Sequence, residues 1–246
     1  RRLYLYRADR GVRLLSLDDL APLSAVALPT PDPVDAFRGY IIIGPIGPIV
    51  PLVDPVSGQI LTIHGRTVLV HDPSTGGAVR EIDVPVRPDS GPVYRAALSD
   101  DGQILYLAVG DSGLADWTDQ PGSVLLALDT ATGDVMGRIE VRALVSDWLA
   151  WDRSLFASTS VYKDIGGHDY LWIDGRVRRE VFEAGVTWTA YDSRRDRLVG
   201  AIGGENDSTL VAADASTLDM VALGSRSAPA ARLLDRWDGQ FTVPGL

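Results

Sequence analysis

The chain has 246 residues, of which 46% are apolar, and a formal net charge of −10. That apolar fraction supports a substantial folded core and excludes a disordered chain. The negative charge disfavours nucleic acid and anionic membrane surfaces as partners, and no apolar run reaches the roughly 18 residues of a membrane helix. Cysteine is absent, which excludes disulfides, thiolate metal sites and a cysteine nucleophile.

Five short apolar segments, taken in chain order, each end in an aspartate that opens a turn. They are residues 14–18, 68–72, 125–129, 170–174 and 210–214, with Asp18, Asp72, Asp129, Asp174 and Asp214 as the aspartates. The two best copies, residues 68–84 and 125–141, align without a gap. Self-similarity at intervals of about 40–60 residues indicates an array of supersecondary units.

A second element alternates with the first: a hairpin turn rich in Asp, Ser and Gly between two apolar segments. It recurs at residues 53–63, 98–108, 151–159, 191–202 and 234–243. These residue types suit tight turns, because Asp and Ser bond the local backbone and Gly accepts positive φ. Each unit therefore reads as strand, Asp/Ser/Gly turn, strand, variable loop, strand, Asp-opened turn, strand. That is a four-stranded antiparallel meander.

The pattern predicts an all-β chain that forms one β-propeller domain over residues 1–246. Helical periodicity is missing from the segments. We expect five blades, with a composite blade in which the C-terminal strand at residues 240–243 pairs with the N-terminal strands; six blades are the alternative. A closed ring removes exposed sheet edges, and we expect a monomer.

The Asp-opened turns with a following Thr-Gly and a closing Ile-x-Val resemble the YVTN-type repeats of quinoprotein amine dehydrogenase-like β-propellers. The residues that carry the resemblance are 72–84 and 129–141, with a degenerate copy at 214–223. The resemblance implies a fold that hosts lyases, lactonases, dehydrogenase subunits and binding modules. The tryptophan that ends true pyrroloquinoline-quinone repeats is absent, so quinone binding is not supported and no cofactor is predicted.

The long, polar connections fall on one face of such a propeller. They are residues 29–47, 64–66, 110–122, 161–168 and 203–208, whereas the turns of the opposite face are short and generic. Variable loops on a rigid scaffold are the usual place for a binding site. The alternative is that the long loops are tolerated insertions.

The innermost strands supply candidate ligand-binding residues at the mouth of the central channel. Counting back from each first turn places Arg95, Trp148 and Trp188 at equivalent positions, beside Tyr94 and Asp147. Rings, a guanidinium and a carboxylate around one mouth suit a small organic ligand. In the competing interpretation the tryptophans fill the propeller axis.

The loop at residues 110–122 carries Asp111, Asp116 and Asp119 together with Trp117. Oxygen-rich loops bind calcium or another divalent metal, although this spacing does not follow the EF-hand pattern. A solvated acidic loop is the alternative. Trp117 is a further ligand-binding candidate.

Four residues are the candidates for catalysis: His64, His168, Asp147 and Lys163. The histidines are candidates for an acid–base pair or for metal ligands, and Lys163 for a Schiff-base amine. Lys163 is also the only lysine, so nearly all the positive charge is arginine. We interpret this bias as a sign of a bacterial protein. For His71, by contrast, a strand position is expected.

Three function classes follow from these observations. The favoured one is a propeller that binds a small molecule at the loop-rich face and channel mouth. The alternatives are an enzyme at the same face (a lyase, hydrolase or cyclase, with or without a metal) and a protein-interaction or sensor domain. The sequence leaves the compartment open, with a secreted or cell-envelope location favoured over the cytoplasm.

Overall fold

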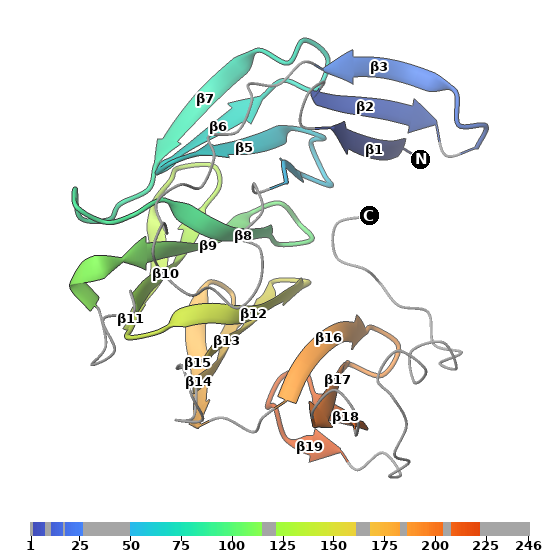
Figure 1. Ribbon diagram of the computed structural model, residues 1–246. Helices are drawn as coiled ribbons and strands as arrows, with labels where there is room; N and C mark the ends of the chain where they lie inside the picture. Colours follow the sequence, from blue (N-terminus) through green and yellow to red (C-terminus); the bar gives the residue numbers. More distant parts are fainter. Residues whose placement is uncertain are drawn as a thin grey trace. The chain divides into compact units, whose positions relative to one another are not determined.

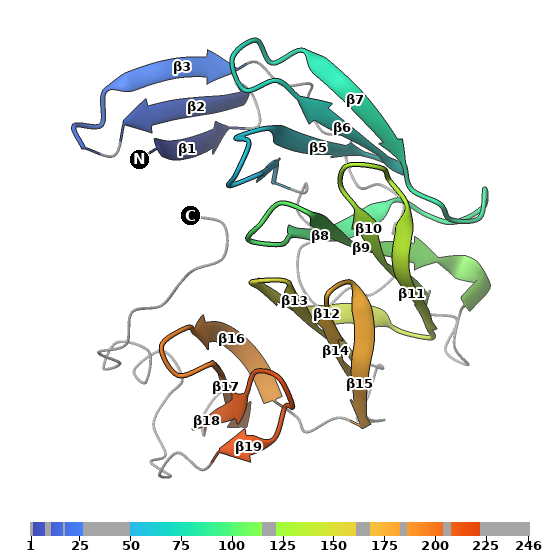
Figure 2. The same ribbon diagram turned by 180° about the vertical axis from the view of Figure 1, so that it is seen from behind.

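Figures 1 and 2 show a computed structural model of the chain from two opposite sides. It describes residues 2–7, 11–16, 18–26, 50–114, 122–160, 168–182, 186–203 and 208–221, to which all structural observations below refer. Apart from one short 3₁₀ turn, Ser112–Leu114, every regular element among these residues is a β-strand. No helix among them is long and apolar enough to cross a membrane.

The strands assemble into five antiparallel sheets, in each of which neighbours in the sheet are neighbours in the chain. Sheet A is β1 (Arg2–Arg7), β2 (Gly11–Ser16) and β3 (Pro22–Val26); sheet B is β4 (Leu52–Val53), β5 (Ile60–His64), β6 (Thr67–His71) and β7 (Ala78–Asp83). Sheet C is β8 (Val93–Leu98), β9 (Ile104–Asp111), β10 (Gly122–Asp129) and β11 (Val135–Val141); sheet D is β12 (Leu144–Trp151), β13 (Ser154–Ser160), β14 (His168–Ile173) and β15 (Arg176–Phe182). Sheet E is β16 (Val186–Asp192), β17 (Arg197–Gly203), β18 (Ser208–Asp214) and β19 (Met220–Val221).

The predicted order of turns and loops is confirmed in sheets B to E. In each of them an Asp/Ser/Gly turn joins the first strand to the second, a variable connection joins the second to the third, and an Asp-opened turn joins the third to the fourth. We call the end of a sheet that carries the second-to-third connection its loop end, and the opposite end its turn end. Since successive strands are antiparallel, the first strand of each sheet also begins at the loop end.

Sheet A has three strands among the described residues, and its aspartate does not take the predicted place. Leu15 pairs with Pro22 as His71 pairs with Ala78 in sheet B, so Ser16 corresponds to Asp72 and Asp18 lies two residues beyond that position. The residue with positive φ in this turn is Leu20. β1 therefore corresponds to the second strand of the other sheets. The partner expected for sheet A at residues 240–243 lies outside the described residues, so the composite blade and the blade count stay predictions.

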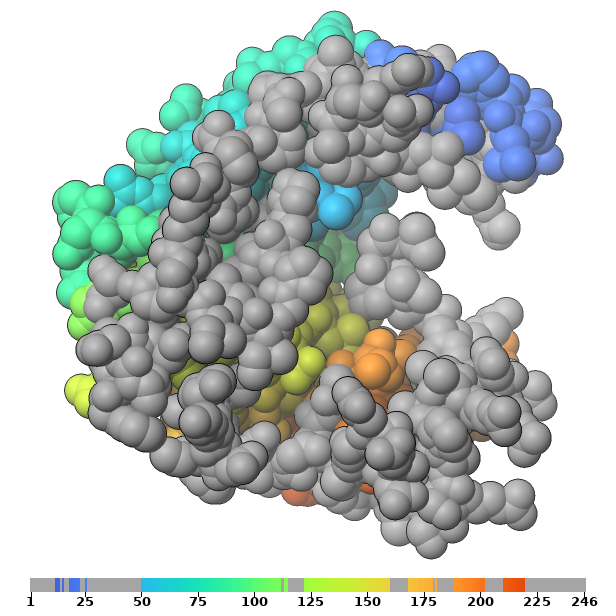
Figure 3. Space-filling view, viewed as in Figure 1, coloured from blue at the N-terminus to red at the C-terminus, as the bar shows by residue number. Residues whose placement is uncertain are grey.

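Contacts divide the chain into two compact units, residues 1–144 and residues 145–244, and the prediction of a single domain stays a prediction. In the first unit, sheets B and C pack through a core that is entirely aliphatic. Its buried members are Leu61, Ile63, Val68, Val70, Ile82, Val84, Val93, Leu105, Leu107, Val109, Val124, Leu126 and Leu128. β7, the outermost strand of sheet B, is mostly exposed and contributes the teal atoms at the surface in Figure 3.

The second unit packs sheet D on sheet E with aromatic side chains. Trp151 stacks on Tyr191 with ring centroids 5.5 Å apart, and Phe156 meets Trp188 edge to face at 6.2 Å. Such pairs add to the free energy of burial because the ring edge and the ring face carry opposite partial charge. Trp188 is 6% exposed and belongs to this core.

Bulges in the innermost strands shift the predicted equivalence of Arg95 and Trp188. The extra residue of β8 is Tyr94, whereas that of β16 is Thr189, on the other side of the predicted position. Arg95 consequently pairs with Ala108, and the residue of β16 at the corresponding place is Thr187, opposite Ala201. A bulge inserts one residue into one strand only, so counting along the sequence fails by one position.

Candidate functional site

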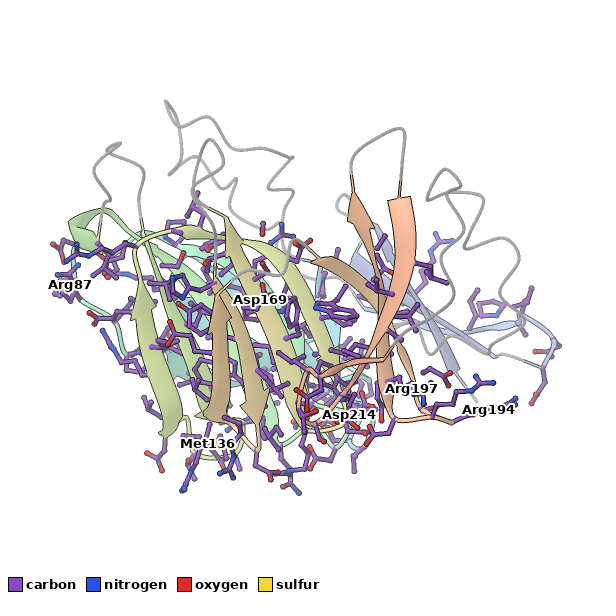
Figure 4. All side chains as sticks on the ribbon, turned by 90° about the horizontal axis from the view of Figure 1, so that it is seen from below. Arg87, Met136, Asp169, Arg194, Arg197 and Asp214 are labelled. Carbon is purple, nitrogen blue, oxygen red and sulfur yellow. The ribbon has the colours of Figure 1, made fainter. Side chains whose placement is uncertain are left out.

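The two ends of the sheets differ in how their polar groups are satisfied. Figure 4 shows Arg87 and Met136 at opposite ends of the strands in the first unit, and Asp169 well away from Arg194, Arg197 and Asp214 in the second. Arg87 lies at a loop end; Met136, Arg194 and Asp214 lie at turn ends. We therefore compare the polar groups at the turn ends with those at the loop ends to find a candidate site.

At the turn end the aspartates bond their own turns. The Asp72 carboxylate accepts from the backbone N–H groups of Ser74 (2.8 Å) and Thr75 (2.9 Å), and the Gly76 N–H closes the turn on the Asp72 carbonyl. The turns at Asp129 and Asp214 repeat this arrangement. The Ser74 hydroxyl, followed by the N–H groups of Ser74 and Thr75, lowers the pKa of Asp72 to about 2. These carboxylates are therefore structural.

Asp174 closes its hairpin differently. It and Gly175 form a two-residue turn in which both have positive φ, the type I′ geometry for which Asp-Gly is favoured. Its side chain accepts from Arg153 Nε at 2.6 Å. The role predicted for Asp174 as a turn former is confirmed.

At the loop end of sheet C a buried carboxylate bonds both to residues more than 20 positions away and to its own loop. Asp111, 2% exposed, pairs with the Arg87 guanidinium and accepts from the Ser90 hydroxyl (3.1 Å) and the Gly113 N–H (2.9 Å). Burial opposes ionisation, but the hydrogen bonds from Arg87, Gly113 and Ser90 outweigh it, so the pKa of Asp111 lies below its ordinary value. Its oxygens are thus occupied by the protein itself.

The calcium interpretation of this loop depends on residues that the structure does not describe. Asp116, Asp119 and Trp117 lie outside the described residues, as does Lys163. Within the described part of the chain, no three His, Asp or Glu side chains gather closely enough to hold a metal ion. A metal at residues 110–122 stays a prediction.

Tyr94, a ligand-binding candidate, is buried in a polar chain that ties two strands together. Its phenol lies 2.6 Å from the Ser123 hydroxyl, which donates to the Ala143 carbonyl at 2.7 Å. Arg95, next to it, is half-buried. Tyr94 therefore has its polar atom engaged inside the protein, while Arg95 is the more accessible of the pair.

Asp147 and Trp148 lie in the middle of β12, the first and edge strand of sheet D. Both are half-buried, and Asp147 receives a long hydrogen bond from the Ser146 hydroxyl (3.4 Å). The indole Nε1 of Trp148 is shielded from solvent and has no hydrogen-bond acceptor among the described residues. A buried N–H without an acceptor costs about 1–3 kcal/mol, so most such groups in proteins have a partner.

His168 opens β14 at the loop end of sheet D and faces a carboxylate across the hairpin. Its Nδ1 lies 2.9 Å from Glu180 Oε1, with the two side chains 43% and 51% exposed. The ring of Tyr170 stacks beside it at 6.2 Å. Burial, followed by the charge of Glu180 and a hydrogen bond to it, raises the pKa of the Tyr170 phenol. Sequence reasoning missed Glu180, although pairing across the Asp-Gly hairpin pointed to that part of β15.

His64, at the loop end of sheet B, is not near His168 in sequence, and the two lie in different units. Its Nε2 lies 3.2 Å from the Thr62 hydroxyl, which in turn lies 2.7 Å from His71 Nε2. His71 is buried in β6, as expected for a strand residue. The structure thus gives each candidate histidine its own local partners.

No protein-family model and no curated protein matches the chain. Solved structures do match. The acylaminoacyl peptidase of Pyrococcus horikoshii is 13% identical (TM-score 0.55, 89% of this chain and 36% of that one). The β-propeller domain of the trilobed protease of Pyrococcus furiosus is 12% identical (0.50, 89% and 66%). An oligogalacturonate lyase in complex with manganese is 17% identical (0.56, 89% and 59%).

At these identities the likeness shows the fold alone: the chain has a β-propeller fold. It spans from 36% to 66% of the length of these three structures. These structures do not show that the chain belongs to the YVTN-type family in particular, so that finer resemblance stays a prediction.

Proposed function

We propose that this chain is a small-ligand-binding β-propeller that holds its ligand along the innermost strands and the loop end. The observation that carries the proposal is the Trp148 indole, whose buried Nε1 has no acceptor among the described residues. The first strand of each blade lies nearest the central channel of a propeller, and Trp148 belongs to such a strand. A ligand oxygen is the partner that this N–H lacks.

The indole defines the chemistry of the ligand. Its face accepts a ring or another apolar surface, and its N–H requires an oxygen acceptor. A sugar acid combines both features. One solved structure of the same fold is a lyase named for oligogalacturonate, so D-galacturonate is a suitable first probe.

Isothermal titration with D-galacturonate, and native mass spectrometry of the purified protein for a co-purifying organic mass, test the proposal. We expect Trp148→Phe to weaken binding about tenfold, the effect of one hydrogen bond to a charged acceptor. Its melting temperature should not fall, because the substitution also removes the N–H that has no acceptor among the described residues.

Trp188→Phe is the matched control. It removes an indole from the core between sheets D and E, so it should lower the melting temperature and leave the affinity unchanged. Equal affinities for the wild type and Trp148→Phe would contradict the proposal. So would the absence of both D-galacturonate binding and any co-purifying organic mass.

A second candidate function is enzymatic catalysis, and the contact between His168 and Glu180 supports it. An imidazole held against a carboxylate is the arrangement that general acid–base catalysis uses, and the Tyr170 phenol adjoins the same carboxylate. Chromatography of digalacturonate incubated with the protein, with and without Mn²⁺, would reveal turnover. We expect Glu180→Gln to lower any turnover at least 100-fold; an undiminished rate removes this pair from catalysis. The protein-interaction class stays a prediction.

A further inference from the structure

A chain of three hydrogen bonds runs through sheet B from its loop end toward its turn end. His64 Nε2 lies 3.2 Å from Thr62 Oγ1, Thr62 Oγ1 lies 2.7 Å from His71 Nε2, and His71 Nδ1 lies 3.0 Å from the Gly76 carbonyl oxygen. Thr62 is 4% exposed and His71 1%, whereas His64 is half-buried. Two of the three histidines of the chain thus share one hydroxyl.

The carbonyl at the far end fixes the direction of the hydrogen bonds. A carbonyl oxygen only accepts, so His71 Nδ1 carries the proton of that bond. In the neutral ring Nε2 is then an acceptor, and the Thr62 hydroxyl must donate to it. The Thr62 oxygen is left to accept from His64, which places the proton of His64 on Nε2. The tautomer of each ring therefore follows from its partners.

We propose that Thr62 and His71 are positioning residues that hold His64 as the Nε2–H tautomer, so that Nδ1 is the proton-accepting nitrogen at the loop end of sheet B. Nδ1 makes no hydrogen bond to any described residue. A ring nitrogen of this kind accepts from a hydroxyl or ammonium group, and the nitrogen that does so is set by the bond the other one makes.

The turn that follows His64 is itself held in place. Gly65, with φ of +58°, accepts from the Val93 N–H at 2.9 Å, and the Arg66 carbonyl accepts from the Val84 N–H at 2.9 Å. Arg66 Nη1 donates to the Arg87 and Pro88 carbonyls at 2.7 Å each. His64 thus sits on a rigid hairpin, which is the condition for a preorganised contact. Its use by a ligand rests on the proposed function; its tautomer does not.

Nuclear magnetic resonance of ¹⁵N-labelled protein, free of ligand and at about pH 8 where histidine is ordinarily neutral, tests the proposal. The chain has only three histidines, so the ring signals are assignable from single His→Gln variants. We expect His64 to show a protonated Nε2 and an unprotonated Nδ1, and His71 the reverse. A protonated Nδ1 on His64, or an even mixture of tautomers, would overturn the proposal.

Thr62→Val removes the hydroxyl without changing the shape of the side chain. It should convert His64 to a mixture of tautomers and leave the signals of His168, in the other unit, unchanged. Thr62→Ser restores a hydroxyl and should restore the wild-type pattern, a rescue that a merely structural Thr62 would not require. An unaltered His64 tautomer in folded Thr62→Val would contradict the proposal; should that variant not fold, the wild-type and Thr62→Ser spectra decide.

D-galacturonate separates this inference from the proposed function. Calorimetry tests the proposed function, which rests on Trp148 of the second unit, whereas the ring signals of the ligand-free protein test the tautomer of His64 in the first. If calorimetry shows no binding, the proposed function fails for this probe, and the ligand-free tautomer still decides whether Thr62 and His71 position His64.

Discussion

The turn ends and the loop ends of these sheets differ in which groups hydrogen-bond their polar side chains. At the turn ends a carboxylate bonds N–H groups two and three residues ahead, as Asp129 does with Ala131 and Thr132. At the loop ends partners also come from far along the chain: Arg87 for Asp111, beside the local N–H of Gly113, and Ser123 for Tyr94. Local bonding makes the turns interchangeable, whereas long-range bonding makes each loop end individual.

The largest effect should come from removing a long-range anchor. Asp111→Ala takes the acceptor away from Arg87, from buried Ser90 and from the Gly113 N–H. We expect the free energy of unfolding to fall by about 2 kcal/mol, the range for hydrogen bonds to a buried charged group. Urea unfolding monitored by tryptophan fluorescence measures it.

Asp129→Ala is the turn-end counterpart in the same sheet. Loss of these local hydrogen bonds costs about 1 kcal/mol, and Asp129→Asn should be close to the wild type, because asparagine forms the same type of turn. If Asp129→Ala cost as much as Asp111→Ala, the distinction between the two ends would not hold.

A smaller, pH-dependent effect is expected at Asp72. Its pKa in the folded chain is about 2, below the ordinary 3.8. At a pH between these two values the unfolded chain therefore binds more protons than the folded chain. The contribution of this carboxylate is fully present above about pH 5 and is lost as the pH falls through about 4 to about 2. The difference in unfolding free energy between the wild type and Asp72→Asn should shrink over that window. A difference that is independent of pH would contradict the assignment.

Local hydrogen bonds at the turn ends could be predicted from the sequence, and long-range ones at the loop ends could not. The turns at Asp72, Asp129 and Asp214 were predictable because the residues that satisfy them lie within the next few positions. The aspartate of sheet A was assigned wrongly: Asp18 matches the local pattern, but strand pairing gives its place to Ser16. Only the register of a sheet reveals such a shift.

The loop-end contacts could not be predicted, because they depend on which distant segments meet. The pairing of Arg87 with Asp111 leaves no spacing in the sequence, whereas the contact of His168 with Glu180 lies across one predicted hairpin and was missed. The bulges at Tyr94 and Thr189 likewise changed which residues correspond between innermost strands. The loop-rich face as the working face was inferred from the sequence and stays a prediction.

The repeated turns have a consequence for how such a chain can arise. The bonds of Asp129 to the N–H groups of Ala131, Thr132 and Gly133 lie within the turn, and Thr130 adds bonds to the Gly102 and Gln103 carbonyls of the neighbouring turn in the same sheet, so a copied four-stranded unit carries these bonds with it. Gene duplication can therefore lengthen the array one unit at a time. The connections between second and third strands differ in sequence from copy to copy, so each is free to acquire a chemistry of its own.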